Sequence, residues 1–205
     1  MKVILINGSP HPKGCTYTAL MEVSKTLNEE GIETEIFNIG TDVPACRGCG
    51  ACSKLGRCIV DDCVNEFTKK AQEADGFIFG SPVHFAAPSG AITSFMSRAF
   101  YSAKSAFVFK PASAIVSARR GGTTAALEPL YKFFTISQMP VISSKYWNMV
   151  HGTKPEDVLK DEEGMSVMRA LGRNMAWFLK LKEAGEKAGI ELPKQEEQIR
   201  TNFIK

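Results

Sequence analysis

The residues most suited to chemistry in this chain are four cysteines in one short, glycine-containing stretch. Residues 45–58 read ACRGCGACSKLGRC, so two, two and five other residues separate the cysteines. Cysteine thiolates bind metal ions and iron–sulfur clusters, and thiols also pair as disulfides. The pattern alone therefore leaves four interpretations open: a cluster, a zinc site, disulfides, or thiols with no shared role. The four residues are Cys46, Cys49, Cys52 and Cys58.

Composition indicates the class of protein and the cellular compartment in which these cysteines act. The length of 205 residues fits one domain, and the content of 44% hydrophobic and 23% charged residues is typical of a soluble globular protein. A net charge of +3, spread along the chain, argues against a nucleic-acid or anionic-membrane partner. We see no signal peptide and no apolar run of the roughly 18 residues that span a bilayer. We therefore expect a cytoplasmic protein, where clustered cysteines more often serve metal binding or redox chemistry than structural disulfides.

Short apolar runs alternate with segments of helical spacing along the chain. This alternation predicts an α/β fold with a parallel sheet covered by helices on both faces. The predicted strands are 2–6, 33–38, 76–80, 112–118 and 140–142. The predicted helices are 16–30, 63–74, 89–104, 124–138 and about 155–188, the last broken near Gly164. We expect one domain over 1–188, with a cysteine-rich loop at 45–63, and a polar tail over 189–205.

The loop NGSPHPKGCT, between the first strand and the first helix, has the character of a phosphate site. Gly8 and Gly14 allow tight turns, while Ser9, Thr16 and the free N–H groups at the helix start can surround an anion. A nucleoside-triphosphate loop needs four residues between its glycines and then lysine, whereas five intervene here and Cys15 follows. The dinucleotide pattern G-x-G-x-x-G is absent. The loop therefore suits one terminal phosphate without magnesium, or an ordinary turn into a helix.

Two further loops follow the third and fourth strands and should meet the first at one edge of the sheet. GSPVHFAAPSG offers an apolar wall with one polar or stacking group: Pro82, Val83, His84 and Phe85. SARRGGTT offers cationic side chains and backbone N–H groups: Arg119, Arg120, Gly121 and Gly122. An isoalloxazine ring needs apolar contact on its faces and hydrogen bonds at its pyrimidine edge, and nearby positive charge would stabilise its reduced form. Each loop alone is also typical of a solvated turn, but the three together predict a flavin site.

These motifs together resemble those of the NADPH-dependent FMN reductase family. They are G-S-P-x-x-x-G-x-T, G-S-P-V-[YH] and A-R-R-G-G, and the resemblance covers roughly residues 1–150. It implies a flavodoxin-like, doubly wound sheet of five parallel strands in the order 2-1-3-4-5. It also implies FMN, with phosphate contacts from Ser9, His11, Cys15, Thr16 and Tyr17 and ring contacts from 82–85 and from Ala118 to Gly122. The chain departs from the family where His84 replaces a tyrosine and Cys15 an asparagine.

The pattern C-x2-C-x2-C-x5-C also looks like the compact motif of iron–sulfur flavoproteins, a branch of the same family. Thiolates three residues apart can enclose one [4Fe–4S] cluster, whereas structural zinc sites favour two C-x-x-C pairs with a longer insert. Gly48, Gly50 and Gly56 leave backbone N–H groups free for the sulfurs. Bare thiols, a labile disulfide and zinc stay as alternatives. Cys63 is expected to be a small buried residue, and Asp61 and Asp62 to cap the next helix.

The sequence thus predicts an FMN-dependent redox protein that transfers electrons through the flavin and a [4Fe–4S] cluster. In one hypothesis it is an enzyme that oxidises NAD(P)H and reduces a small molecule such as a quinone, a metal, an oxygen species or a flavin. In a second it is a carrier that exchanges single electrons with a ferredoxin-type partner, which the four-cysteine loop favours. A third, weaker hypothesis is a thiol-based redox sensor. No general acid or base is evident, and we expect a homodimer or homotetramer.

Overall fold

The structure is a computed structural model that describes residues 1–197, 199 and 201–203. Over these residues, five parallel strands form one sheet in the order β2-β1-β3-β5-β6. They are β1 (Lys2–Asn7), β2 (Glu33–Asn38), β3 (Gly76–His84), β5 (Ala112–Ala118) and β6 (Met149–His151). The two-residue β4 (Ala87–Pro88) pairs antiparallel with β3, outside this path. Numbered along the chain without β4, the parallel strands therefore follow the predicted order 2-1-3-4-5.

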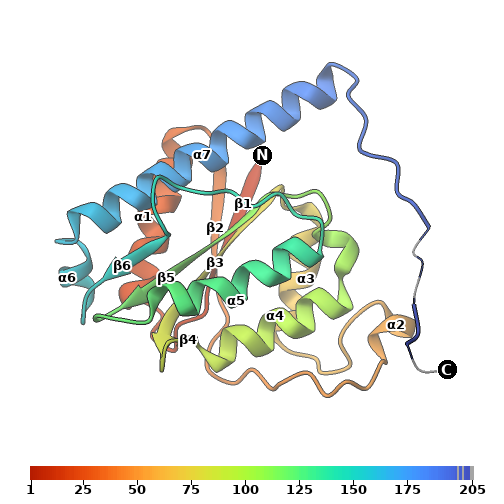
Figure 1. Cartoon of the computed structure of the whole chain (residues 1–205), viewed down its shortest axis with the longest axis horizontal. Coiled ribbons are helices and arrows are strands. Elements are labelled where there is room, and N and C mark those ends of the chain that lie inside the picture. Colours follow the sequence, from red (N-terminus) through yellow and green to blue (C-terminus); the bar gives the residue numbers. More distant parts are fainter. Residues whose placement is uncertain (198, 200, 204–205) are drawn as a thin grey trace.

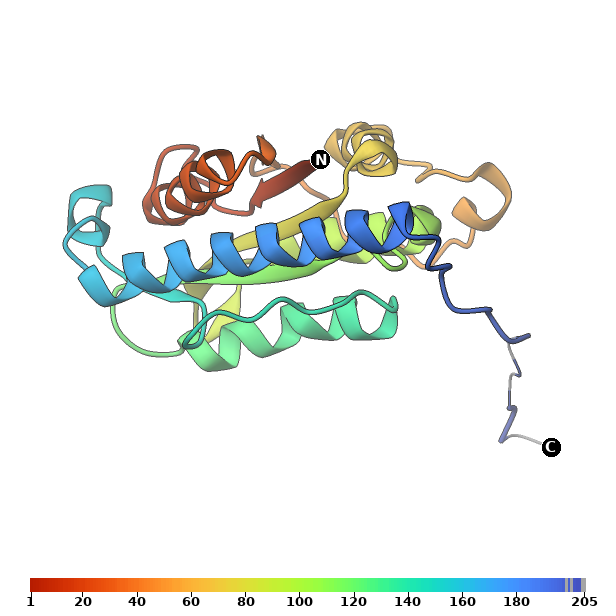
Figure 2. The ribbon, with the colours of Figure 1, turned by 90° about the horizontal axis from the view of Figure 1, so that it is seen from above.

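The helices cover both faces of this sheet, as Figure 1 shows. They are α1 (Cys15–Glu29), α2 (Cys52–Leu55), α3 (Cys63–Glu73), α4 (Gly90–Ser102), the 3-10 turn η1 (Lys104–Ala106), α5 (Thr123–Ile136), α6 (Pro155–Val158) and α7 (Glu162–Lys187). The long α7 runs along the length of the molecule (Figure 2). The segment that contains α2 extends from the main body on the side away from α6 (Figure 1).

Alternation of side chains in β1 explains its unbroken apolar run. Val3 and Leu5 belong to the core under α1 and α7, whereas Ile4 and Ile6 belong to the core under α3, α4 and α5. All four are fully buried. Successive side chains of a strand point to opposite faces, so a strand covered on both faces must be apolar at every position.

Phenylalanines hold α3 and α4 against the sheet. Phe67 of α3 lies 5.0 Å from Phe95 of α4 and 6.0 Å from Phe77 of β3, between ring centroids. Phe100 of α4 stacks on Phe107 at 4.3 Å. Aromatic pairs at such distances contribute about 0.5–1.5 kcal/mol each beyond the area they bury. This packing gives α4 a fixed position beside the sheet.

The prediction of a fifth strand at 140–142 is wrong. Within that segment Val141 forms a single parallel bridge with Ala112, and the strand proper is β6, which pairs with the end of β5. Between the two contacts the chain leaves the sheet edge, and the buried Asn148 amide donates to the Ala114 carbonyl at 3.0 Å and to Ser113 Oγ at 2.9 Å. Pairing register with β5, rather than local hydrophobicity, therefore decides where this strand lies.

Most predicted helices and strands differ from the observed ones by one or two residues at an end, and a few features need separate comment. The strand β3 continues past 80 to His84, because it pairs with β4 as a hairpin. The predicted break near Gly164 in the carboxy-terminal helix is confirmed: it lies at 159–161, and the Gly164 N–H donates to the Asp161 carboxylate that caps α7. The predicted irregular region before Cys63 contains the short α2. Of the two predicted caps, Asp62 caps α3, since its carboxylate accepts the Val64 N–H at 3.0 Å, whereas the Asp61 carboxylate accepts the Asn65 side-chain amide at 3.1 Å instead.

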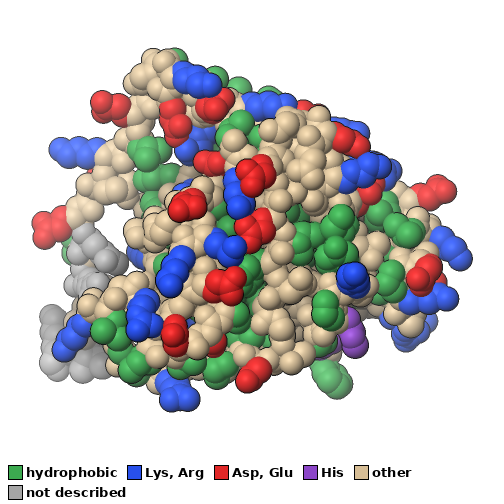
Figure 3. All heavy atoms as spheres, turned by 180° about the vertical axis from the view of Figure 1, so that it is seen from behind, with side chains coloured by type: hydrophobic (Ala, Val, Ile, Leu, Met, Phe, Trp, Pro, Cys, Tyr) green, Lys and Arg blue, Asp and Glu red, His purple; other side chains and the backbone are tan. Residues whose placement is uncertain are grey.

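The described residues after Lys187 form no helix or strand. They lead away from the sheet in Figure 1, although Gln138 Nε2 donates to Gln195 Oε1 at 2.9 Å. Positions 198, 200, 204 and 205 of the predicted tail lie outside the described residues. Acidic and basic side chains lie next to each other over the face shown in Figure 3. None of the described helices combines the length and the apolar character needed to cross a bilayer.

Candidate functional site

The three predicted flavin loops lie side by side at the carboxyl edge of the sheet. They leave β1, β3 and β5, which are direct neighbours in the strand order. Short hydrogen bonds join two of them, because the Gly8 N–H donates to the Gly80 carbonyl at 2.8 Å and Ser89 Oγ–H donates to the Gly8 carbonyl at 2.8 Å. A Cβ on Gly8 would lie 2.7 Å from Ile92 Cβ, so only glycine permits this contact. The prediction that the loops converge is therefore confirmed.

The first turn of α1 presents its backbone without a capping side chain. Its N-cap is Gly14, and its first turn contains no acidic residue, so the positive end of the helix is free for an anion. Ser9 Oγ accepts the His11 N–H at 3.1 Å, which folds the preceding loop into a tight turn. Phosphate contacts at this helix start would therefore come mainly from the backbone.

Side chains at the start of α1 are partly engaged inside the protein. Thr16 is buried, and its hydroxyl lies 2.8 Å from Ser117 Oγ of β5. Cys15 is half-buried, its thiol donates to the Gly152 carbonyl at 3.6 Å, and burial raises its pKa. Tyr17 is half-buried, and His11 is exposed. The Thr16 side chain therefore faces the sheet. The full set predicted to contact the phosphate is Ser9, His11, Cys15, Thr16 and Tyr17.

The predicted ring-contact loop after β3 is a hairpin with a strained tip. Pro82 and Val83 are half-buried, whereas His84 is exposed and Phe85 is fully exposed. Phe85 and Ala86 both have positive φ, 51° and 59°, between the paired residues His84 and Ala87. This arrangement is a type I′ turn, which normally selects Asn-Gly. Each such residue other than glycine costs about 1–2 kcal/mol, so the hairpin holds an aromatic side chain outward at a cost in stability.

The loop after β5 packs against this hairpin. Ala118 is buried, and Arg119, Arg120 and Gly121 are exposed. Gly122 caps α5 with φ +90°, and a Cβ there would lie 2.8 Å from Ala86 Cα. The two loops therefore meet through their backbones, next to two exposed arginines.

These features fit FMN. An uncapped helix start can accept a phosphate, and the hairpin and the glycine loop leave apolar surface and backbone N–H groups beside it. Arg119 and Arg120 add positive charge at the same edge.

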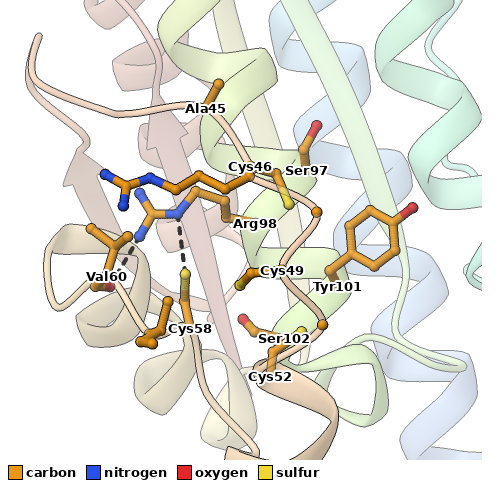
Figure 4. Close-up of a pocket in the computed structure, with 14 residues that line it drawn as sticks. Ala45, Cys46, Cys49, Cys52, Cys58, Val60, Ser97, Arg98, Tyr101 and Ser102 are labelled. Carbon is orange, nitrogen blue, oxygen red and sulfur yellow. Dashed lines mark hydrogen bonds between the residues drawn. The ribbon is translucent and has the colours of Figure 1, made fainter.

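The four cysteines of the predicted cluster motif line one cavity of about 440 Å³. Cys46 and Cys49 are exposed, Cys52 and Cys58 are half-buried, and all are free thiols. Figure 4 shows the four side chains around the same space, with Ser97, Arg98, Tyr101 and Ser102 of α4 along one wall. Gly48 and Gly50, which lie between three of the cysteines, have φ of +62° and +69°, so the path of the loop depends on glycine.

The four thiols surround a cavity rather than converging on one point. Among the described residues, no three His, Cys, Asp or Glu side chains are grouped as ligands of one metal ion. A single zinc would require four donors within about 2.3 Å of one point. The thiols instead surround a cavity of ligand size, which agrees with a bulkier sulfur-bridged group. Cys63 does not line this cavity; it packs against the core but is half-buried rather than buried as expected, and this partial burial raises its pKa to about 11, with the Asp62 charge adding to the effect.

Arg98 is a site residue that the sequence analysis missed. It is 2% exposed, and its Nε–H donates to Cys58 Sγ at 3.3 Å (Figure 4). Burial alone would lower the pKa of Arg98, but the hydrogen bonds that it donates to Asp62 and Cys58 outweigh burial and raise it. The available signal was a lone arginine within the apolar helical segment ITSFMSRAFYS, since a buried charge needs partners. The other α4 residues in the cavity wall, Ser97, Tyr101 and Ser102, carried no such signal.

Comparison with known proteins agrees with this geometry. The sequence model of the family described as NADPH-dependent FMN reductase matches residues 1–154, so the chain belongs to that family. The chain is similar to an iron-sulfur flavoprotein of Methanocaldococcus jannaschii, with 35% identity over 191 residues, 88% of this chain and 98% of that protein.

Solved structures show the same fold. RosB with the bound intermediate 8-demethyl-8-formylriboflavin-5′-phosphate matches with a TM-score of 0.68 and 14% identity, over 100% of this chain and 92% of RosB. A flavodoxin from the domain Archaea matches with a TM-score of 0.60 and 14% identity, over 88% of this chain and 99% of the flavodoxin. The fold is therefore flavodoxin-like. Membership of the family makes the chain an FMN-dependent oxidoreductase.

Proposed function

We propose that this oxidoreductase moves electrons between FMN and a [4Fe–4S] cluster held by Cys46, Cys49, Cys52 and Cys58. The observation that carries the proposal is that all four thiols line one cavity against α4. The same helix begins at the flavin edge, where its N-cap Ser89 donates to Gly8. From there to Arg98, α4 rises about 1.5 Å per residue, or roughly 13 Å. One rigid helix thus contacts both candidate sites.

The flavin loops would bind and orient FMN through the residues already described. The first turn of α1 would hold the phosphate, and the residues 82–85 and 118–122 would contact the ring. Bound FMN would supply hydride or single-electron chemistry, and the cluster one-electron transfer. Arg119 and Arg120 would stabilise negative charge on the reduced ring. A cluster in addition to the flavin favours partners that exchange single electrons.

The electron donor in this proposal is a ferredoxin-type protein, with NAD(P)H as the alternative donor. Two of the four cysteines are exposed, so the cavity is open at the protein surface. Arg47, Lys54 and Arg57 are exposed on the same loop, and positive charge there would attract an acidic partner. The final acceptor would be a small molecule or a second protein.

Oligomerisation is also part of the proposal. Trp177 and Leu181 lie one turn apart on α7 and are 64% and 50% exposed. Large apolar side chains at this spacing support a contact between two copies of the chain, as a homodimer or a homotetramer. Light scattering of the purified chain would give the mass, and Trp177→Glu should shift it toward the monomer. An unchanged monomeric mass in the parent chain would contradict this part.

The cluster is tested by anaerobic purification with assays of iron, sulfide and FMN. We expect roughly four irons and four sulfides per chain, together with FMN. Cys46→Ser, Cys49→Ser, Cys52→Ser and Cys58→Ser should each lose most of the iron but keep FMN, because the flavin loops are unchanged. Cys63→Ser is the matched control and should keep both, since Cys63 lies outside the cavity. A parent chain with FMN but without iron and sulfide would leave a cluster-free reductase.

The donor is tested by rapid anaerobic mixing of the FMN-loaded chain with NADPH, NADH or reduced ferredoxin. If the absorbance of oxidised flavin is lost quickly with reduced ferredoxin but not with NADPH or NADH, the proposed donor is supported. Fast loss with NADPH or NADH would instead support a pyridine-nucleotide oxidase. In that case the carrier hypothesis fails, while the flavin site stands.

A further inference from the structure

Arg98 uses every N–H of its guanidinium group at the cysteine cavity. Nη1 donates to Asp62 Oδ2 at 2.6 Å and to the Pro44 carbonyl at 3.4 Å. Nη2 donates to Asp62 Oδ1 at 2.8 Å and to the Val60 carbonyl at 3.0 Å. The fifth donor, Nε–H, meets Cys58 Sγ at 3.3 Å. An arginine has five N–H donors, so each of them has a partner.

The two-pronged contact with Asp62 fixes the plane of the guanidinium group. Asp62 is itself held at the start of α3, where its carboxylate accepts the Val64 N–H. Both terminal nitrogens already donate to other acceptors, and the fixed plane of the group directs the remaining donor, Nε–H, toward Cys58. Lysine lacks both the planar fork and the Nε–H, and would reproduce the charge without the geometry.

Arg98 also connects two arms of the cysteine loop to α4. Pro44 precedes Cys46 on the first arm, and Val60 follows Cys58 on the second. The arginine is 2% exposed, and its charge therefore acts across protein rather than across water. Asp62 offsets part of that charge through its ion pair with Arg98 Nη1 at 2.6 Å.

From this arrangement we propose that Arg98 raises the reduction potential of the cluster through its hydrogen bond to the ligand Cys58. The inference rests on the proposed cluster. One-electron reduction, with the electron supplied by the flavin or a partner protein, adds one negative charge without breaking a bond. Part of that charge collects on the cysteine sulfurs, and a cationic N–H donor to one of them stabilises the reduced form. Arg98 acts through Cys58 and is therefore a positioning residue.

The test is a redox titration of the loaded protein, in which the potentials of cluster and flavin are both read. In Arg98→Gln and Arg98→Lys, the cluster midpoint should shift to more negative values, while the flavin midpoint stays unchanged. Arg57→Gln is the matched control: it removes the same charge one residue from Cys58, but Arg57 is exposed and pairs with Asp61 at 3.4 Å. Its shift should be smaller. Equal cluster midpoints in the parent, Arg98→Gln and Arg98→Lys would overturn the inference.

A second measurement needs no stable variant at position 98. The parent chain is labelled with ¹⁵N at arginine Nε, and nuclear couplings to the reduced cluster are read by electron–nuclear double resonance. A ¹⁵N coupling that persists in Arg47→Gln would support the contact, since Arg47 also lines the cavity. Absence of a coupling in the parent would overturn the inference even if the Arg98 variants fail to assemble. A parent chain that binds no iron would defeat the proposed function instead.

Discussion

Ala86 and Gly122 lie in direct backbone contact, which locks the hairpin after β3 to the loop after β5. A Cβ at Gly122 would stand 2.8 Å from Ala86 Cα and 2.9 Å from its Cβ. Gly122 also has φ +90°, a conformation that other residues rarely adopt. The two loops proposed to contact the flavin ring therefore depend on one another.

Replacement of this glycine should damage both stability and flavin binding. We expect Gly122→Ala to lower the free energy of unfolding by about 1–3 kcal/mol, because it adds strain and a steric clash. Urea denaturation gives the first quantity, and titration of FMN fluorescence gives the affinity, which should fall.

Gly121→Ala is the control for this substitution. Gly121 is exposed, its φ is not positive, and a Cβ there would meet no atom within 4 Å. Its free energy of unfolding should change by less than about 0.5 kcal/mol. Equal losses in the two variants would contradict the importance of the Ala86 contact.

The strain at the hairpin tip predicts a stabilising substitution. Ala86 has φ 59° and is exposed, so Ala86→Gly relieves strain and removes little packing. We expect the free energy of unfolding to rise by about 1 kcal/mol. Ala87→Gly, one residue along in β4, should lower it by about 0.5–1 kcal/mol. Thermal or urea unfolding of both variants measures these changes. A lower free energy of unfolding in Ala86→Gly than in the parent would show that the tip is not strained.

The charge cluster around Glu35 predicts a stability difference that depends on pH. Its carboxylate lies 2.8 Å from Lys2 Nζ and 2.8 Å from Lys70 Nζ, and their hydrogen bonds lower the pKa of Glu35. Because the folded pKa is depressed, the contribution to stability is complete above the unfolded value of about 4.5 and is lost as the pH falls through the folded value. We expect Glu35→Gln to cost roughly 0.5–1 kcal/mol near neutral pH.

Urea unfolding at a series of pH values tests this. The gap between Glu35→Gln and the parent should be constant from neutral pH down to about 5 and should shrink below that. Glu33→Gln is the control on the same strand, because Glu33 is 72% exposed and lies 3.7 Å from Lys2. It should change stability little. A gap that persists unchanged at pH 3 would contradict the assignment.

The partial burial of Cys63 predicts slow alkylation. Its pKa is raised to about 11, first by burial and then by the Asp62 charge, and only the thiolate reacts. In the metal-free chain, the rate of Cys63 modification by iodoacetamide should rise with pH up to about 11, and exposed Cys46 should react faster at pH 8. Peptide mass spectrometry follows each site. In denaturant the Cys63 profile should move to about pH 8.5; a folded profile already there would contradict the burial argument.

Local sequence signals predicted the elements that depend on neighbours in the chain. Alternation of β1, α1 and β2 required a parallel sheet, and that geometry places the loops after β1, β3 and β5 at one edge. The cap at Asp62 was predictable for the same reason, since its carboxylate accepts the N–H of Val64, only two residues further along the chain. The position of the fifth strand could not be predicted from neighbouring residues. It depends on which residues pair with Ala112 and Val116 at the edge of β5.

The sequence by itself determined the family, the flavin loops and the four cysteines, because each is a set of residue types at fixed spacing. Only the tertiary structure decided that the cysteines face one wall of α4 and that Arg98 is bonded to Cys58, forty residues away along the chain. Contacts of that range arise when the core packs α3 and α4 together, and no pattern of neighbouring residues encodes them. A separate contact, between α5 and the hairpin that contains β4, brings Gly122 against Ala86, and the glycine pair in the sequence does not by itself reveal it.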